Sequence, residues 1–227
     1  MPTREAFPCR LFLLDLDGTL IDSQEDIVRS LNLALARMRL PALSPARIGA
    51  FVGDGVQLLI ERALAASAGR SPDPEETGRG LELFREEYGR HLLDHTRLVP
   101  GAGAALERLH WARCAVVSNK PADFCRRILA GLGVAGRFEI ILGGDSTRNR
   151  KPDPEPLLEA IRFCRVPAAE AVMVGDSRVD IEAGRAAGVF TCGVLGGFRP
   201  EAELASSGCD LLIRSLAELP DRFRPPE

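Results

Sequence analysis

The chain has 227 residues, of which 45% are hydrophobic and 27% charged, with a net charge of -3 at pH 7. These values are typical of a globular protein with one core or a core and a smaller inserted domain. This slightly negative net charge gives no indication of the basic surface by which proteins bind nucleic acids or anionic membranes. No apolar run reaches the ~18 residues of a membrane span. We therefore expect neither nucleic acid nor membrane as a partner.

The first ten residues lack the long apolar region of a secretory signal. Six cysteines are scattered along the chain without a Cys-x-x-Cys pair, which favours buried free thiols over disulfides. Both observations lead us to expect a cytoplasmic protein. The sequence does not decide between a monomer and a homodimer.

Short apolar runs indicate the strands of a buried parallel sheet, at 11–14, 114–117, 138–142, 171–174, 190–194 and 211–213. Helical segments alternate with them, at 101–111, 122–132, 154–164 and 179–187. Strands that alternate with helices form a parallel sheet covered on both faces. We therefore expect an α/β, Rossmann-like fold with its site at the carboxyl ends of the strands. The tail, 222–227, is expected to be frayed.

The stretch 22–98 contains no strand-like run. It shows three apolar stripes at helical spacing, carried by Ile27, Leu31, Leu35 and Met38, by Val56, Leu59, Ile60, Ala63 and Leu64, and by Leu81, Phe84, Tyr88 and Leu92. Asp22, with Glu25 three residues later, can cap the first helix. We predict a helical cap domain at 22–98, inserted into an α/β core formed by 1–21 and 99–227. Its position directly after the first strand favours a lid over a purely structural bundle.

Two aspartates, Asp15 and Asp17, stand just beyond the first apolar strand. In an extended chain, side chains two residues apart point the same way, ~6.6 Å apart, so both carboxylates face one loop. Gly18 permits a sharp turn, and Thr19 can hydrogen-bond into it. Such a pair alone is usually a solvated loop. Its place at the end of a wholly apolar strand points to a functional site.

Asp176 ends another predicted strand, and Asp180 lies just inside the helix that follows. Several carboxylates at neighbouring strand ends repel one another, and a hard divalent cation relieves that repulsion. Magnesium favours one or two carboxylates together with water and substrate phosphate. The sequence therefore predicts a magnesium site. Because Ser177-x-x-Asp180 is also a good helix start, a metal role for Asp180 stays open.

Ser118 and Asn119 end the second strand and offer donors suited to phosphate oxygens. Lys151 lies in a loop before a helix, where Pro152 keeps it extended, so its ammonium can reach the site and balance the aspartates and the phosphate. Lys120 and Lys151 are the two lysines among 29 basic residues, and each can mark a place that needs a compact ammonium. Lys120 is less clear, since the start of a helix is also an ordinary surface position.

These segments together resemble the haloacid dehalogenase superfamily of phosphatases over nearly the whole chain. The family's four motifs are matched in order by Asp15-Leu16-Asp17-Gly18-Thr19, Ser118-Asn119, Lys151-Pro152 and Gly175-Asp176-Ser177-x-x-Asp180. The helical insertion is similar to the family's α-helical cap. Two further segments look most like the phosphoglycolate phosphatase group, namely Phe51-Val52-Gly53-Asp54-Gly55 and Val99-Pro100-Gly101.

The resemblance implies magnesium-dependent hydrolysis of a phosphate monoester through an aspartyl-phosphate. It makes Asp15 the nucleophile and a metal ligand, and Asp17 the acid and base, with its backbone carbonyl on the metal. The other implied roles are a metal ligand at Asp176, support of the metal by Asp180, and phosphate binding by Thr19, Ser118, Asn119 and Lys151. Gly53, Asp54 and Gly55 would face the substrate from the cap.

We expect the substrate to be a small phosphorylated acid such as 2-phosphoglycolate. The aromatics of the insertion fit its apolar stripes or their edges, which leaves no stacking platform for a nucleotide base. A carboxylate could be bound by backbone amides around Gly53 and Gly55, or by one of the arginines Arg29, Arg47, Arg62 and Arg85.

Other functions fit the same motifs. A phosphomutase similar to β-phosphoglucomutase is the closest alternative, followed by a phosphatase of a sugar phosphate or pyrophosphate. A true dehalogenase has no evident use for the metal-binding aspartates. A non-catalytic phosphate-binding module is the least favoured, since every acidic and phosphate-binding position is filled.

Overall fold

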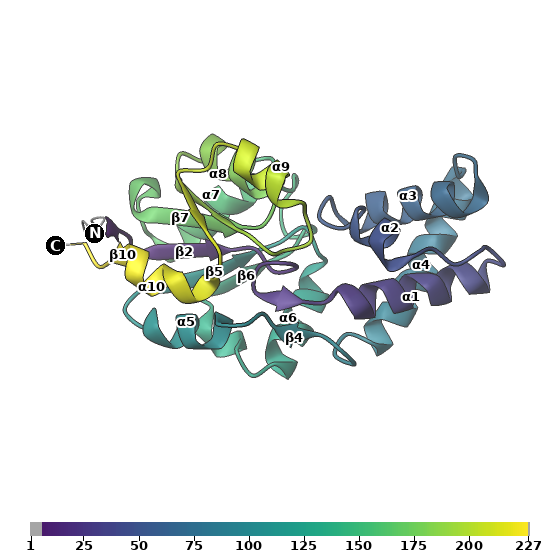
Figure 1. Cartoon of the computed structure of the whole chain (residues 1–227), viewed down its shortest axis with the longest axis horizontal. Helices are drawn as coiled ribbons and strands as arrows, with labels where there is room; N and C mark the ends of the chain where they lie inside the picture. Colours follow the sequence, from purple (N-terminus) through teal and green to yellow (C-terminus); the bar gives the residue numbers. More distant parts are fainter. Residues whose placement is uncertain (1–5, 227) are drawn as a thin grey trace.

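The computed structural model describes residues 6–226 and has a six-stranded parallel sheet at its centre, in the order β6-β5-β2-β7-β8-β9 (Figure 1). The strands are β2 (Leu11–Leu14), β5 (Arg113–Val117), β6 (Ile140–Leu142), β7 (Ala171–Gly175), β8 (Phe190–Val194) and β9 (Leu211–Ile213). Each corresponds to a predicted strand, with ends that differ by at most two residues.

Alternate residues of each strand point to opposite faces of the sheet, and helices cover both faces. Phe12 and Leu14 belong to one apolar cluster, which includes residues of α5 (Ala102–Arg108) and α6 (Ala122–Gly131). Leu11 and Leu13 belong to a second, which includes residues of α7 (Glu155–Cys164) and α8 (Arg178–Ala186). The predicted Rossmann-like α/β architecture is therefore confirmed.

The helical insertion lies beyond the carboxyl ends of the strands (Figure 1). It consists of α1 (Gln24–Arg37), α2 (Pro45–Gly49), α3 (Val56–Ala68) and α4 (Pro74–Arg90). The chain leaves the core through β3 (Ile21–Asp22) and returns through β4 (Arg97–Leu98), and these two strands pair antiparallel. This short ribbon was not predicted. It straddles the expected domain boundaries, which stay a prediction.

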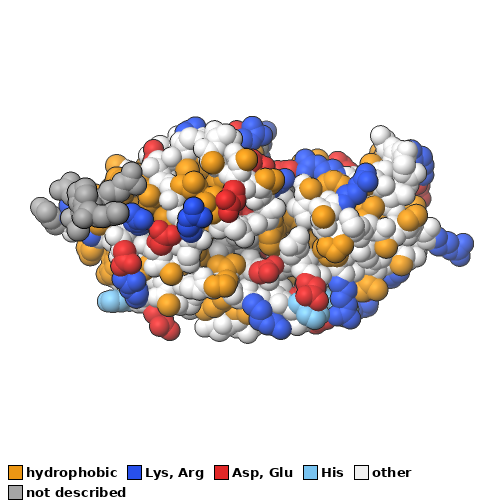
Figure 2. All heavy atoms as spheres, in the orientation of Figure 1, with side chains coloured by type: hydrophobic (Ala, Val, Ile, Leu, Met, Phe, Trp, Pro, Cys, Tyr) orange, Lys and Arg blue, Asp and Glu red, His pale blue; other side chains and the backbone are white. Residues whose placement is uncertain are grey.

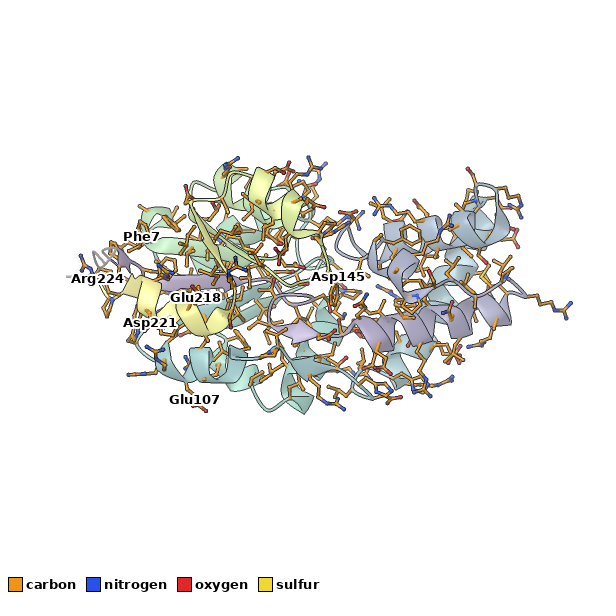
Figure 3. All side chains as sticks on the ribbon, viewed as in Figure 1. Phe7, Glu107, Asp145, Glu218, Asp221 and Arg224 are labelled. Carbon is orange, nitrogen blue, oxygen red and sulfur yellow. The ribbon has the colours of Figure 1, made fainter. Side chains whose placement is uncertain are left out.

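Two local predictions were wrong. Asp22 does not cap α1, because Ser23 occupies the N-cap position and the Asp22 carboxylate only accepts the Gln24 N–H. The tail is not frayed through Arg224, since β10 (Phe223–Arg224) pairs with β1 (Phe7–Pro8) and the Phe223 ring packs edge-on against Phe12. Figure 3 shows Phe7 and Arg224 at the end of the molecule opposite the insertion.

The remaining elements are short and lie at the margins of the sheet. They are α9 (Glu201–Ser206), α10 (Leu219–Arg222) and the 3-10 turns Ala135–Arg137, Ala168–Glu170 and Leu216–Glu218. On the face shown in Figure 2, acidic and basic side chains are interspersed, in keeping with the small net charge. None of the helices within 6–226 combines the length and the apolar character needed to cross a membrane.

Asp26 ties the start of the insertion to its end. This carboxylate, in the first turn of α1, is 0% exposed. It accepts the His95 N–H at 3.0 Å, the Thr96 N–H at 2.8 Å and the Thr96 hydroxyl at 2.7 Å. The segment that leads into β4 is therefore fastened to the helix that follows β3, so the two connections between core and insertion form one unit.

Replacing this carboxylate should destabilise the protein. Asp26→Ala leaves two backbone amides and one hydroxyl without their acceptor, and we expect it to lower the free energy of unfolding by about 3 kcal/mol. Asp26→Asn keeps one acceptor oxygen and should lose less. Urea unfolding followed by circular dichroism measures both, with Asp123→Ala, an exposed aspartate in the first turn of α6, as the control. Equal losses for Asp26→Ala and Asp123→Ala would contradict the assignment.

Candidate active site

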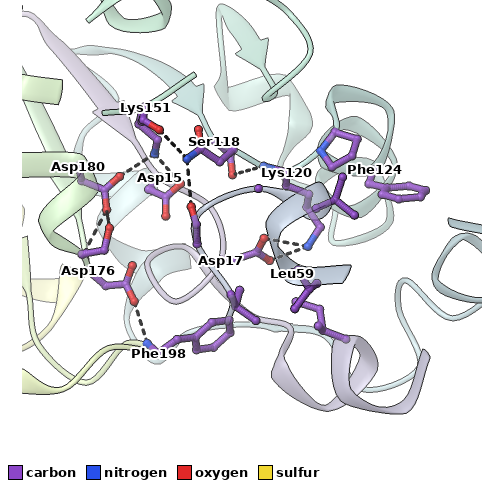
Figure 4. Close-up of a pocket in the computed structure, with 18 of the residues that line it drawn as sticks. Asp15, Asp17, Leu59, Ser118, Lys120, Phe124, Lys151, Asp176, Asp180 and Phe198 are labelled. Carbon is purple, nitrogen blue, oxygen red and sulfur yellow. Dashed lines mark hydrogen bonds and ion pairs between the residues drawn. The ribbon is translucent and has the colours of Figure 1, made fainter. Parts of the chain in front are cut away.

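Three neighbouring strands deliver polar side chains to one pocket. Asp15 follows β2, Ser118 follows β5 and Asp176 follows β7, and these strands are adjacent in the sheet. Lys151 reaches the same pocket from the loop before α7, as Figure 4 shows. The structure thus brings together the residues that the sequence placed at separate strand ends.

Lys151 lies at the centre of this arrangement. Its ammonium donates to Asp15 Oδ1 at 2.8 Å, to Asp180 Oδ1 at 2.6 Å and to the Val117 carbonyl at 2.6 Å. Burial alone would lower the pKa of Lys151, but the two carboxylates outweigh it and the pKa is raised. The lysine is therefore a fixed positive charge with all three N–H groups in use.

The carboxylates beside Lys151 carry more negative charge than one ammonium offsets. Asp15, Asp176 and Asp180 each place one oxygen within 4.8 Å of the others. Burial raises the pKa of Asp15 to about 6, although Lys151 partly opposes the shift. Burial and then the charges of Asp15 and Asp180 raise the pKa of Asp176 well above its usual value. A hard divalent cation binds oxygen ligands, and it would offset the negative charge that Lys151 leaves uncompensated. This cluster therefore fits the predicted metal site.

Asp180 makes the predicted helix-start contact and also reaches the pocket. Its Oδ2 accepts the Ser177 N–H at 3.1 Å and the Ser177 hydroxyl at 2.6 Å, which fixes the start of α8. Its Oδ1 faces Lys151. One oxygen holds the helix while the other belongs to the site, so the helix-start pattern and the site assignment are compatible.

Asp176 is packed between two glycines. A Cβ atom added at Gly18 would lie 2.3 Å from Asp176 Oδ2, and one at Gly197 would lie 2.2 Å from it. Gly18 also has a φ of +82°, which side chains rarely adopt. The Phe198 N–H donates to Asp176 Oδ2 at 2.7 Å. The loop after β8 therefore approaches Asp176 closely, a contact that sequence reasoning missed.

Asp17 forms an ion pair with Lys120. Lys120 is therefore buried and is not an ordinary surface residue at the start of a helix. The Lys120 ammonium lies 2.7 and 2.8 Å from the two Asp17 carboxylate oxygens, and its side chain is 5% exposed. The Ser23 hydroxyl also donates to Asp17. Burial lowers the pKa of Lys120, but Asp17 raises it by more. Both lysines of the chain thus line the pocket, which agrees with the special role that their rarity indicated.

Ser118 and Asn119 line the pocket in different ways. The Ser118 Oγ accepts the Lys120 N–H at 3.3 Å. The Asn119 side-chain amide donates to the Lys151 carbonyl at 2.9 Å and to the Gly53 carbonyl at 3.0 Å. Its N–H groups are therefore committed to the loops around the site, so the expected donation from this amide to phosphate does not fit this arrangement.

The loop before α3 forms part of the pocket wall. Gly53 and Gly55 line the pocket, whereas Asp54 points to Arg62 at 2.5 Å and to Arg199 at 3.4 Å. Thr19 is 0% exposed and lines a separate cavity beside Gly18. The structure therefore does not bring Asp54 or Thr19 to the pocket with the other predicted residues.

The insertion contributes an apolar wall to the pocket, made by Ile27, Val52, Val56, Leu59, Phe84 and Tyr88. The arginines proposed to bind a carboxylate, Arg29, Arg47, Arg62 and Arg85, are not part of the pocket lining. The arginine that does line it is Arg199, from the loop after β8. A cation from that loop had no recognisable signal in the sequence.

Comparison with known proteins identifies the family of this chain. The family model described as haloacid dehalogenase-like hydrolase matches residues 12–194. A protein of Cupriavidus necator named "phosphoglycolate phosphatase, plasmid" is 38% identical over 97% of this chain and 95% of its own length. A phosphoglycolate phosphatase of Chromobacterium violaceum is 36% identical over 92% of this chain and 94% of its own.

The crystal structure of a predicted phosphoglycolate phosphatase from Haemophilus somnus superposes with a TM-score of 0.88 at 30% identity. The match covers 93% of this chain and 96% of that one. The range matched by the family model extends over Asp15, Ser118, Lys151 and Asp176. The chain therefore belongs to the haloacid dehalogenase-like hydrolases.

Proposed function

We propose that this phosphoric monoester hydrolase acts on a small phosphorylated carboxylic acid, 2-phosphoglycolate, with Mg²⁺ as its metal. The observation that carries the proposal is the buried Asp15, held by Lys151 beside Asp176 in a pocket that the helical insertion covers with an apolar wall. The names of the relatives from Cupriavidus necator and Chromobacterium violaceum support the choice of substrate.

In this mechanism Asp15 is the nucleophile. Lys151 holds Asp15 Oδ1, which leaves Oδ2 to attack the phosphorus atom. The new bond joins Oδ2 to phosphorus while the bond from phosphorus to the ester oxygen breaks, and the leaving oxygen takes a proton from Asp17. Ser118 would hold a phosphoryl oxygen, and the positive charge of Lys151, which is bound to Asp15, would attract the phosphoryl group. Mg²⁺, held by Asp15, Asp176 and the Asp17 backbone carbonyl with support from Asp180, would neutralise charge on the phosphoryl group.

The second half of the reaction restores Asp15. Water attacks the phosphorus of the aspartyl-phosphate, Asp17 accepts a proton from that water, and the bond from phosphorus to Asp15 breaks to release inorganic phosphate. The apolar wall from the insertion would exclude other water while this happens. We assign residues 22–98 to a cap domain on this basis.

Metal removal should abolish hydrolysis reversibly. Without a divalent cation the carboxylates of Asp15, Asp176 and Asp180 repel each other and the substrate phosphate. After dialysis against a chelator we expect turnover of p-nitrophenyl phosphate to vanish and to return with Mg²⁺. Calcium should inhibit, because its looser and higher-coordinate shell misplaces Asp15. Titration calorimetry should show Mg²⁺ binding that Asp176→Asn weakens. Full turnover in chelated, metal-free protein would refute the metal assignment.

Substitution of the two aspartates of the first motif should impair different steps of the reaction. Asp15→Asn should remove turnover and covalent labelling together, since an amide is a poor nucleophile. Asp17→Asn should slow hydrolysis on the order of 10²- to 10⁴-fold and still form phosphoenzyme from p-nitrophenyl phosphate, whose leaving group needs no proton. Acid quench and mass spectrometry distinguish the two. Asp22→Asn, at an exposed position, is the control. Turnover retained by Asp15→Asn, or phosphoenzyme that it forms at another residue, would show that the Asp15 carboxylate is not the nucleophile.

The substrate assignment is tested by comparing kcat/KM for 2-phosphoglycolate, glucose 6-phosphate and adenosine monophosphate. We expect 2-phosphoglycolate to be preferred by at least about tenfold. The apolar wall leaves little room for a sugar or a base, and it offers neither of them a hydrogen bond. A preference for the nucleotide would refute the argument from size. A preference for the sugar phosphate would keep the mechanism and change the substrate class.

A further inference from the structure

We propose that Lys120 binds the carboxylate of the substrate and thereby determines the preference for phosphorylated acids. The inference rests on the proposed function, since it concerns the part of the pocket that receives the leaving group. It also replaces the expectation that an arginine of the insertion binds this carboxylate. None of those four arginines belongs to the pocket wall that the structure describes.

The chemistry of the substrate defines where its carboxylate must lie. In a two-carbon acid phosphorylated at its hydroxyl, the carboxyl carbon is two single bonds of about 1.5 Å each from the ester oxygen. Asp17 must come within about 2.6–3.2 Å of that ester oxygen to transfer a proton. The group that binds the carboxylate must therefore be an immediate neighbour of Asp17.

Lys120 is that neighbour. Its ammonium lies 2.7 and 2.8 Å from the two Asp17 oxygens and lines the same pocket. Figure 4 shows Lys120 on the side of Asp17 that also carries Leu59 and Phe124. These apolar side chains offer a carboxylate no hydrogen bond, so on this side the attraction for an anion comes from Lys120.

The two lysines differ in the number of acceptors they already hold. The Lys151 N–H groups are all committed, to Asp15, Asp180 and the Val117 carbonyl. The Lys120 ammonium donates to the two oxygens of a single carboxylate, Asp17, at 2.7 and 2.8 Å, and it lies 4.7 Å from the centroid of the Tyr88 ring. One of its three N–H groups is therefore not directed to an oxygen atom. An ammonium with three donors can serve two carboxylates at once. Lys120 can therefore accept the substrate carboxylate beside Asp17, whereas Lys151 cannot without losing a partner.

Tyr88, in helix α4 of the insertion, restricts the position of the Lys120 ammonium. The Tyr88 ring stacks on Phe84 with centroids 5.3 Å apart and meets the edge of Phe124 at the same distance. A cation over a desolvated aromatic face is attracted to it, and the fixed ring limits where the ammonium can move. The carboxylate site is therefore preorganised, and it is complete only while α4 covers the pocket.

Arg199 is the competing candidate, because it also lines the pocket. Its guanidinium is directed to the Ala50 carbonyl at 3.1 Å and to Asp54 at 3.4 Å. These partners belong to the loop before α3, and Asp54 already supplies a carboxylate to it. Arg199 thus joins the core to the insertion, and the hydrogen bonds that the structure assigns it do not include Asp17.

The test compares 2-phosphoglycolate with 2-hydroxyethyl phosphate, which replaces the carboxylate by a neutral group of similar size. The measured quantity is the ratio of the two kcat/KM values. For the wild type we expect a ratio on the order of 100 in favour of the acid, as a charge-assisted pair in a desolvated pocket provides. Lys120→Met and Lys120→Gln should reduce the ratio to within about threefold of one. Lys120→Arg should retain most of it.

Two control variants separate charge from position. Arg126→Met removes an exposed cation from α6, the helix that follows Lys120, and should leave the ratio unchanged. Arg199→Met should lower kcat/KM for both substrates by the same factor. Circular dichroism and thermal unfolding identify any variant that does not fold, and Lys120→Gln, which can still hydrogen-bond Asp17, then replaces Lys120→Met.

Each outcome has a definite meaning. If the wild type prefers the acid but the Lys120 variants lose both activities equally, Lys120 only positions Asp17 and the inference is wrong. It is also wrong if Arg199→Met, rather than Lys120→Met, abolishes the preference. If the wild type itself does not prefer the acid, the proposed substrate fails together with the carboxylate site. A selective loss in Lys120→Met and Lys120→Gln supports both.

Discussion

The contact between the Lys151 ammonium and two buried carboxylates is the interaction on which the pocket depends. Asp15 follows β2, Asp180 lies in α8, and Val117 ends β5, so one side chain joins three segments that are far apart in the sequence. Burying charges costs free energy unless each is paired and hydrogen-bonded. Removing this lysine would leave two carboxylates in repulsion inside the protein, and the strand ends would no longer converge in the same way.

The second lysine repeats this arrangement on the other side of the pocket. Lys120 pairs with Asp17 as Lys151 pairs with Asp15, so each aspartate of the first motif has its own ammonium. The partners of Lys120 differ, however, because Tyr88 of the insertion lies over it and Ser23, at the connection to the insertion, contacts Asp17. The position of the Asp17 side chain therefore depends on contacts with the insertion, whereas the position of Asp15 depends on the core alone.

Sheet and insertion also share one apolar cluster. Phe12 and Leu14 of β2 belong to the same buried group as Leu31 and Leu35 of α1. Buried apolar contact of this kind favours a defined arrangement of the two parts in the absence of substrate. The hydrogen bonds of Asp26 to His95 and Thr96 act at the connections themselves.

The sequence predicted the sheet well because parallel strands buried on both faces are continuously apolar, and few other local patterns resemble them. It predicted Asp15, Ser118 and Asp176 as neighbours because the carboxyl ends of parallel strands meet at one edge. It did not predict the pairing of Lys120 with Asp17 or the approach of Phe198 to Asp176, since these contacts join segments with no shared periodicity. The β1–β10 pair was missed for a related reason, because strands of two residues leave no alternation to detect.

The distribution of basic residues has a consequence for the chemistry of the surface. Of 29 basic residues two are lysines, and both lie buried in the pocket, with whole-residue exposures of 8% for Lys120 and 3% for Lys151. The exterior of residues 6–226 therefore presents guanidinium groups, whose charge persists to high pH and which react poorly with acylating reagents. Amine-directed reagents that modify other proteins at many surface positions would reach a lysine of this one only by entering the pocket. Acylation of a lysine side chain would thus report how far the pocket is open.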